Sequence, residues 1–214
     1  LEWMNAHYDQ SYARAYETFC NIENGQVHIT GTMSVSAPTV QRILNVKAEW
    51  IITPDGAIRV KMNVKRDMEF PMLPRFGIRL FLDKEFDNAE YYGIGPDESY
   101  VDKKRSGYHG KHCAEIHEMH EDYLRPQENG SHWNCSGLAL TSSDHRSLLV
   151  SGAQNFSFSA SRYTQEELTT KAHSFELEKS PYTVLCLDGY MSGCGSNSCG
   201  PALAKEYRVD QDKL

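Results

Sequence analysis

The chain has 214 residues, enough to bury a substantial hydrophobic core as one large domain or two small ones. Its net charge of −7, without any basic cluster interleaved with aromatic residues, argues against a nucleic-acid partner. No segment approaches the run of about 18 apolar residues that a membrane span requires, so no membrane association is expected.

The first third of the chain combines an ambiguous start with two clear hairpins. Between Trp3 and Phe19, large apolar residues recur at spacings of three and four, which fits a short helix, although their aromatic content also suits a strand. Polar and apolar residues then alternate on both sides of Asn24-Gly25, a strong hairpin signal. The turn residues of TPDG separate two further alternating segments, 42–52 and 57–67, and predict a second hairpin.

The rest of the sequence continues as a series of short strands with one helix. Strands are predicted at 76–82, 89–95, 136–143, 147–153, 155–161, 173–179, 182–190 and 204–210. Thr164 and Glu167 form a capping-box pattern that predicts a helix start. Because no helix alternates with the strands, a parallel α/β sheet is excluded and one β-rich domain over residues 1–214 is expected.

Histidine and cysteine residues gather in one segment: His109, His112, Cys113, His117 and His120. On a helix, four of them would share a face and form a metal-binding cluster. However, HEMH is one residue short of the zincin spacing, and two neighbouring glycines disfavour a helix. We therefore predict a solvated connecting segment without a metal, and keep the metal site as the alternative.

The stretch from Leu187 to Leu203 is rich in glycine and predicts a loop. It contains Cys194 and Cys199, a pair that does not meet the four-ligand requirement of a structural zinc site. A disulfide between them is geometrically possible in an oxidising compartment. We expect two unpaired thiols instead, since six cysteines spread over a chain of this length favour an intracellular protein.

No catalytic motif is present. The sequence lacks G-x-S-x-G, a P-loop and a dinucleotide-binding G-x-G-x-x-G, and most of its acidic residues, a set that includes Glu98 and Glu128, are expected to be solvated surface. Two stretches, Tyr91–Tyr100 and Tyr123–Trp133, place aromatic residues among amides and carboxylates. Such residues suit sugar recognition, but equally suit buried polar turns, which we favour.

Five stretches in a fixed order carry a family resemblance: LPRFGIRLFL, EYYGIGPDESYVDKK, YLRPQENG, FSFSASRYTQEEL and LDGYMSGCGSNSCGP. From about Trp3 onward the chain resembles the C-terminal, small-chain domain of glycoside hydrolase family two β-galactosidases. The resemblance implies a large antiparallel β-sandwich, or supersandwich, with a galactose-mutarotase-like fold. Because family members usually carry earlier strands, and the chain begins with Leu1, we expect a fragment truncated at its N-terminal side. An uncovered sheet edge would favour a homo-oligomer.

The resemblance also implies a function. The family's enzymes are retaining glycosidases that release terminal β-linked galactose, and their two catalytic glutamates lie on a (β/α)₈ barrel earlier in the polypeptide. That barrel needs about 250 residues and is absent from this sequence. We therefore expect a non-catalytic domain of a cytoplasmic enzyme that partners the barrel domain and completes the active-site wall. Magnesium and sodium would belong to the parent enzyme, with no cofactor in this domain.

In the family, the glycine-rich loop reaches toward the active site, where a tryptophan stacks on the leaving sugar. Matching the loop places Cys199 at the tryptophan position, with Asn197 and Ser198 before it as further substrate-binding candidates. A thiol offers no ring face for stacking. The alternatives are a free-standing carbohydrate-binding module or an aldose epimerase. An epimerase needs a histidine facing a glutamate, and the candidate histidines are His109, His117, His120 and His132.

Overall fold

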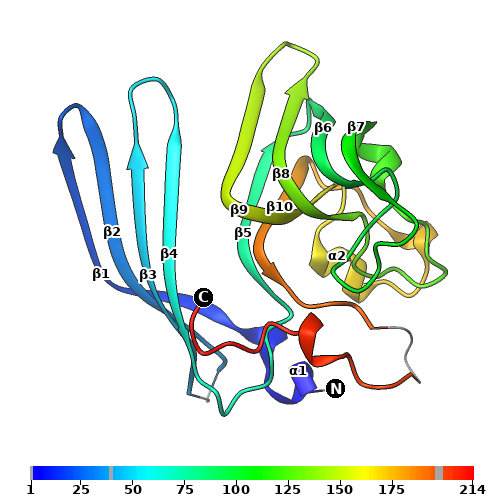
Figure 1. Cartoon of the computed structure of the whole chain (residues 1–214), viewed down its shortest axis with the longest axis horizontal. Coiled ribbons are helices and arrows are strands. Elements are labelled where there is room, and N and C mark those ends of the chain that lie inside the picture. Colours follow the sequence, from blue (N-terminus) through cyan, green and yellow to red (C-terminus); the bar gives the residue numbers. More distant parts are fainter. Residues whose placement is uncertain (1, 39–40, 196–199) are drawn as a thin grey trace. The chain divides into compact units, whose positions relative to one another are not determined.

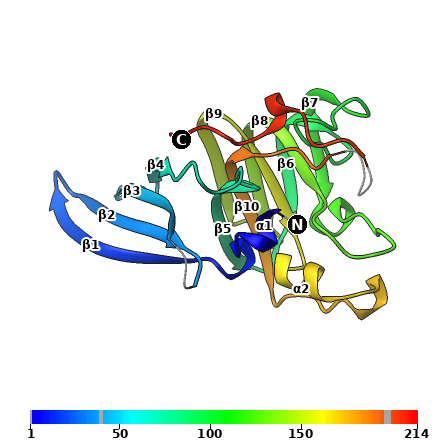
Figure 2. The ribbon, with the colours of Figure 1, turned by 90° about the horizontal axis from the view of Figure 1, so that it is seen from below.

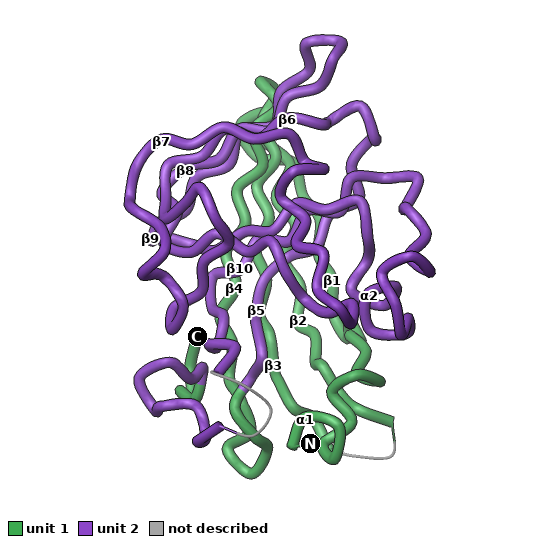
Figure 3. The backbone as a smooth tube through the Cα atoms, turned by 90° about the vertical axis from the view of Figure 1, so that its right-hand side faces the viewer, with its two compact units in different colours: residues 1–72, 210–214 green, residues 73–209 purple. Residues whose placement is uncertain are grey.

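The computed structural model describes residues 2–38, 41–195 and 200–214, which belong to two units (Figure 3). Unit 1 comprises Leu1–Met72 and Asp210–Leu214, and unit 2 comprises Leu73–Val209. Each unit contains one antiparallel sheet, and the described helices are short. The predicted all-β, antiparallel fold class is thus confirmed, whereas the assignment of 1–214 to a single domain stays a prediction.

The sheet of unit 1 is a meander of four strands that follow one another in chain order (Figure 1). Its elements are α1 (Glu2–Asn5), η1 (Tyr8–Gln10), β1 (Tyr12–Glu23), β2 (Gln26–Ser36), β3 (Arg42–Ile52) and β4 (Ile58–Arg66). Both predicted hairpins are confirmed, and Asn24 and Gly25 adopt positive φ angles of 51° and 76°, as a two-residue hairpin loop requires. The strand alternative for the early aromatic segment is correct, because the helix ends at Asn5.

The alternation of residue types along β3 gives the sheet of unit 1 two different faces. Leu44, Val46 and Ala48 are buried, whereas the residues between them are exposed. This period of two is the pattern of a strand with one covered face. Strand β1 lies at the edge of this sheet and all its residues are exposed. The self-association expected for an open edge stays a prediction.

Arg66 joins the two chain segments that make up unit 1. Val64 on β4 exchanges two backbone hydrogen bonds with Leu214, at 2.9 and 3.1 Å. The Arg66 side chain is buried and donates to the carbonyl oxygens of Phe70 and Pro71 and, at 2.7 Å, to the carboxylate of Asp210. One guanidinium group therefore binds carbonyl oxygens of the turn after β4 and also holds the C-terminal segment beside that turn.

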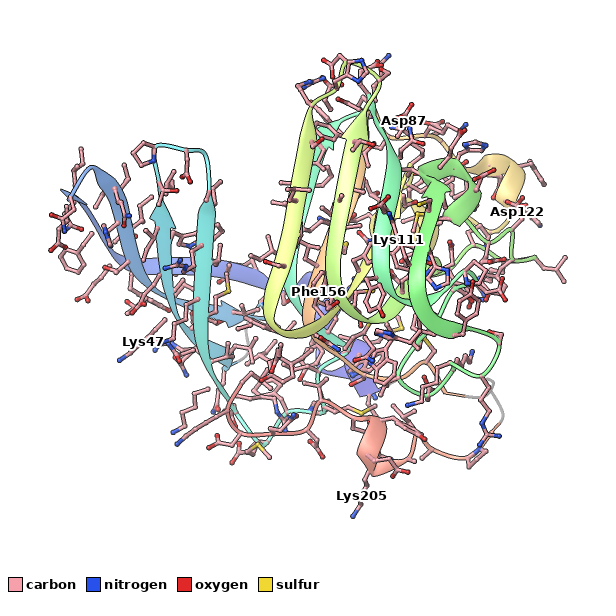
Figure 4. All side chains as sticks on the ribbon, turned by 45° about the horizontal axis from the view of Figure 1, so that its top comes forward. Lys47, Asp87, Lys111, Asp122, Phe156 and Lys205 are labelled. Carbon is pink, nitrogen blue, oxygen red and sulfur yellow. The ribbon has the colours of Figure 1, made fainter. Side chains whose placement is uncertain are left out.

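Unit 2 contains a six-stranded antiparallel sheet in the order β5-β10-β9-β8-β6-β7 (Figure 1). The strands are β5 (Arg75–Asp83), β6 (Phe86–Gly95), β7 (Tyr108–Glu115), β8 (Ser131–Ser142), β9 (Ser147–Ser161) and β10 (Tyr182–Met191). The core of this unit includes Leu140, Phe158 and Leu185, none of which is accessible to solvent. Phe156, labelled on β9 in Figure 4, belongs to the same cluster. Central strands thus supply the core.

The predicted helix after β9 is confirmed as α2 (Gln165–Thr170). The hydroxyl of Thr164 accepts a hydrogen bond from the amide of Glu167 at 3.1 Å, one of the two capping-box bonds. Gln165 donates to the thiol of Cys186 on β10, and Figure 2 shows α2 next to this strand. The short helix therefore covers part of the sheet.

Two predicted strands of unit 2 are wrong. Segment 173–179 contains the 3₁₀ helix η3 (Ser174–Glu176), because the Glu176 carboxylate accepts the amides of Ala172 and His173 and stabilises a local turn. Segment 204–210 contains η4 (Lys205–Tyr207), and its described β-pairing is a single bridge between Val209 and Leu73. Alternation over so few residues does not specify a strand without a neighbour to pair with.

Candidate functional site

Three loops of unit 2 meet at the side chains of Glu98 and Asp102. The first loop follows β6 and carries both carboxylates, the second precedes β8, and the third continues from β10 into the glycine-rich stretch. Because each loop starts or ends at a strand of the same sheet, the sheet sets their positions. This loop cluster, around Glu98 and Asp102, is the candidate functional site.

Glu98 links the two aromatic stretches identified in the sequence. Its carboxylate accepts the amide of Gly130 at 2.9 Å, the hydroxyl of Tyr100 at 3.1 Å and the hydroxyl of Tyr123. The hydrogen bond to Glu98 raises the pKa of Tyr123, while burial and then Glu98 raise the pKa of Tyr100. Both hydroxyls therefore stay protonated and act as donors, and Glu98 is an exception to the prediction that most acidic residues are solvated surface.

Ser99 joins the same two stretches through hydrogen bonds to backbone atoms. Its side chain is fully buried, and its hydroxyl donates to the carbonyl of Ile94 at 3.0 Å and accepts the amide of Trp133 at 2.9 Å. Its amide donates to Ser131 at 2.6 Å. These polar groups satisfy buried backbone atoms, which is the structural interpretation favoured from the sequence.

Asp102 holds the start of the glycine-rich loop. Its two carboxylate oxygens accept the amides of Cys194, at 3.1 Å, and Gly195, at 2.8 Å. Gly195 has a φ of +77°, which favours glycine. The segment that follows β10 is therefore hydrogen-bonded to a carboxylate on another loop.

Arg75 binds two carboxylates at the end of the sheet where this loop begins. It contacts Asp188 of β10 through two nitrogens, one at 2.9 Å, and Glu128 at 2.8 Å. Burial raises the pKa of Glu128, and the Arg75 charge opposes that rise. One guanidinium therefore holds both carboxylates, and Glu128 is an exception to the prediction that most acidic residues are solvated surface.

A buried aromatic cluster lies behind the loops. Tyr91 and His132 are hydrogen-bonded at 2.9 Å through the hydroxyl and Nδ1, and the Tyr91 ring also packs against His112 with centroids 5.2 Å apart. Burial lowers the pKa of His132 to about 4, so its ring is neutral at neutral pH. The cluster is a core feature rather than a site open to substrate.

The histidine-rich segment divides between β7 and η2 (Ile116–Met119), so the helical arrangement of a metal cluster is wrong. Lys111, labelled in Figure 4, pairs with Glu90 on β6 at 3.0 Å. His112 is buried, contrary to the prediction of a solvated segment, whereas His109 and His117 are exposed. Within residues 2–38, 41–195 and 200–214, no group of three His, Cys, Asp or Glu side chains is arranged to hold a metal.

The predicted substrate-binding residues Asn197, Ser198 and Cys199 lie outside the described residues, so their roles stay predictions. The same holds for the expectation that Cys194 and Cys199 are unpaired thiols and for the alternative of a disulfide between them. The described cysteines form no disulfide with one another: Cys20, Cys113, Cys135, Cys186 and Cys194.

Two grooves of unit 1 enclose about 820 and 640 Å³ and are lined by residues of β1 to β4 and their flanking segments. Neither lining contains a histidine. They therefore give the epimerase alternative no support. In the part of the chain that the structure describes, no helix has the length and apolar character needed to cross a membrane.

Comparison with known proteins identifies the family of this chain. A profile described as "Beta galactosidase small chain" matches residues 1–214. The chain is 44% identical over 212 residues to a β-galactosidase of Actinobacillus pleuropneumoniae, and 32% identical over 209 residues to one of Staphylococcus xylosus. These matches cover 99% and 98% of this chain. The chain belongs to the β-galactosidase small-chain family.

The chain spans about a fifth of the length of these relatives, 21% in both cases. It thus corresponds to a part of a larger β-galactosidase. The family resemblance seen in the sequence is confirmed, and two of its five stretches contain the loop-anchoring residues Glu98 and Asp102 and the start of the loop that Asp102 holds. Sequence reasoning missed these two anchors, and the only local signal for them is that both follow the Gly-Pro turn after β6.

Proposed function

We propose that this chain is the non-catalytic C-terminal domain of a family two β-galactosidase that hydrolyses terminal non-reducing β-D-galactose residues with retention. The observation that carries the proposal is the extent of the match: the family covers the whole chain, while the chain covers about a fifth of each relative named β-galactosidase. The domain's partner is the remaining polypeptide, which supplies the catalytic barrel.

The chemistry of the described carboxylates supports a non-catalytic role. A retaining glycosidase needs two carboxyl groups about 5–5.5 Å apart, one of them free to give and take a proton. Asp188 and Glu128 share Arg75, and Glu98 accepts three hydrogen bonds. These groups are already engaged in holding loops. We assign the catalytic glutamates, and any magnesium or sodium ions, to the rest of the enzyme.

We assign the glycine-rich loop to the wall of the parent enzyme's active site, with Asn197, Ser198 and Cys199 facing the substrate. The support is the family match together with the fixed start of the loop at Asp102. A cysteine at position 199 provides no ring face for the leaving sugar, which reduces the contribution of this wall to aglycone binding.

Changing Cys199→Trp in the complete enzyme is expected to lower KM for lactose by about two- to tenfold, because an aromatic ring adds a stacking surface worth roughly 0.5–1.5 kcal/mol. Steady-state kinetics with lactose and a small aryl galactoside measure the effect. Cys113→Trp, at an exposed cysteine, is the matched control and is expected to leave KM unchanged for both lactose and the aryl galactoside. An unchanged KM for lactose in Cys199→Trp would remove the loop from the aglycone site.

The accessory role is tested by separating the chain from its partner. The complete polypeptide, the same polypeptide ending before this chain, and the shortened form with this chain added in trans are compared on a β-galactoside. We expect the shortened form to lose activity and the added chain to restore it, whereas an unrelated β-sandwich protein does not. Full activity of the shortened form would show that this chain contributes nothing to the active site or its assembly.

A further inference from the structure

We infer that Asp102 is a positioning residue for the substrate-facing loop: it fixes the backbone at Cys194 and Gly195, the described start of that loop. The inference rests on the proposed function for its effect on substrate. Its structural part concerns only described residues of unit 2.

The contact consists of two hydrogen bonds from backbone amides to one carboxylate. Oδ1 of Asp102 accepts the amide of Cys194 at 3.1 Å, and Oδ2 accepts the amide of Gly195 at 2.8 Å. Two successive amides bound by one carboxylate fix both the position and the direction of the backbone. Hydrogen bonds to an ionised acceptor are also about twice as strong as neutral ones. Asp102 lies more than ninety residues earlier in the chain, so the contact restricts the loop from outside.

Gly193 allows the close approach. A Cβ atom at this position would lie 2.5 Å from Cγ of Asp102, 2.6 Å from Oδ1 and 2.7 Å from Oδ2. These three atoms are the nearest neighbours of that position, so the space beside Gly193 is filled by this one side chain. The glycine is therefore required by the carboxylate rather than by its own backbone conformation, since Gly193 is not among the positive-φ residues.

Both partners of this contact are held in place by their surroundings. Asp102 lies in a turn closed by reciprocal bonds between Tyr100 and Lys103, at 2.8 and 3.0 Å, and Tyr100 is buried. On the other side, the amide of Gly193 donates to Tyr207 at 2.8 Å and the amide of Ser192 donates to Pro74 at 2.9 Å. Loss of Asp102 would thus free the segment after Gly193 while leaving the strand before it fixed.

The test uses the complete β-galactosidase with Asp102→Ala, Asp102→Asn and, as a control, the exposed Asp97→Ala in the same loop. We expect Asp102→Ala to raise KM for lactose about tenfold with kcat changed less than about twofold, since loop placement governs binding of the leaving sugar. Asp102→Asn retains one accepting oxygen and is expected to be intermediate. Asp97→Ala is expected to match the unmodified enzyme.

Hydrogen exchange in the same proteins reports the contact itself. The amides of Cys194 and Gly195 are expected to exchange faster in Asp102→Ala than in Asp97→Ala, without a change in the melting temperature of the enzyme. Unchanged exchange of these two amides would show that Asp102 does not anchor the loop. Faster exchange with an unchanged KM would overturn the positioning role. If the unmodified enzyme hydrolyses no β-galactoside, the proposed function fails instead, and the exchange result still decides the anchor.

A double substitution gives an independent check. Gly193→Ala is expected to raise KM and speed exchange in the unmodified background, because the new methyl group displaces the carboxylate. In the Asp102→Ala background the methyl group has room, so adding Gly193→Ala is expected to cause little further change. Equal effects of Gly193→Ala in both backgrounds would show that the two residues act independently and would contradict the inference.

Discussion

Replacing Asp188 by alanine is expected to lower the free energy of unfolding by about 3 kcal/mol, because removing one partner of a buried ion pair leaves the other charge uncompensated. The Asp188 side chain is 4% exposed and that of Arg75 is 24% exposed, so water cannot easily replace the lost carboxylate. Glu128 contacts Arg75 through the third nitrogen, Nη1, whereas Asp188 binds Nε and Nη2, so the substitution removes the partner of two of the three nitrogens. Urea denaturation at neutral pH measures the loss.

The matched control is Asp144→Ala. Asp144 pairs with Arg146 at 2.7 Å, but both side chains are about half exposed, at 54% and 47%. Exposed pairs of this kind contribute little to stability, because water screens the two charges, so this variant is expected to resemble the unmodified chain. Equal losses for the two variants would show that burial does not distinguish these ion pairs, contrary to our account of the Arg75 site.

Lowering the pH from 7 to 5 is expected to remove about 2 kcal/mol of stability through His132 alone. Burial holds its folded pKa at about 4, below the ordinary value of 6.5, so the unfolded chain binds a proton over this range and the folded chain does not. The contribution is complete above pH 6.5 and is lost as the pH falls toward 4. The ring of Tyr91 packs against that of His132, and the charge of His112 lowers the pKa of His132 further, so the sign is unchanged.

The variant His132→Asn tests this pH dependence, because its amide still reaches the Tyr91 hydroxyl but does not titrate. Unfolding free energies at pH 7 and pH 5 are compared within each protein, so any general destabilisation by the substitution cancels. We expect the variant to lose about 2 kcal/mol less than the unmodified chain between these pH values. The same loss in both proteins would mean that His132 titrates normally in the folded state.

Local signals in the sequence were sufficient for the hairpins and the helix start. Asn24-Gly25 and TPDG specify their turns without help from distant residues, and Thr164 caps α2 through a residue three positions away. The same rules failed for 173–179, where Glu176 stabilises a turn that competes with the apparent alternation. Patterns of six or seven residues do not decide between these outcomes.

The loop cluster could not be predicted because its contacts join distant parts of the chain. Glu98 reaches Gly130 across 32 positions and Asp102 reaches Gly195 across 93. In the sequence both look like ordinary acidic residues of a soluble chain, and only the fold reveals that each binds backbone amides. His112 was likewise misplaced, because strand β7 buries it against Tyr91 on the neighbouring strand. The family, in contrast, was evident from five short stretches in a fixed order.

The proposed function has two halves: this chain is a part of a β-galactosidase, and it supports catalysis that is carried out elsewhere in the polypeptide. Its family match and its share of the relatives' length give the first half of that statement. The carboxylates engaged by Arg75 and by the loop amides support the second half. Together they predict that the complete polypeptide hydrolyses β-galactosides and that the isolated chain does not.

Hydrolysis of a chromogenic β-galactoside by this chain alone, and by the complete polypeptide that contains it, tests the central claim most directly. We predict release of the chromophore by the complete polypeptide and none above the uncatalysed rate by the chain alone, at equal molar concentration. Hydrolysis by the isolated chain would contradict the account, because a catalytic pair of carboxylates would then lie within these 214 residues.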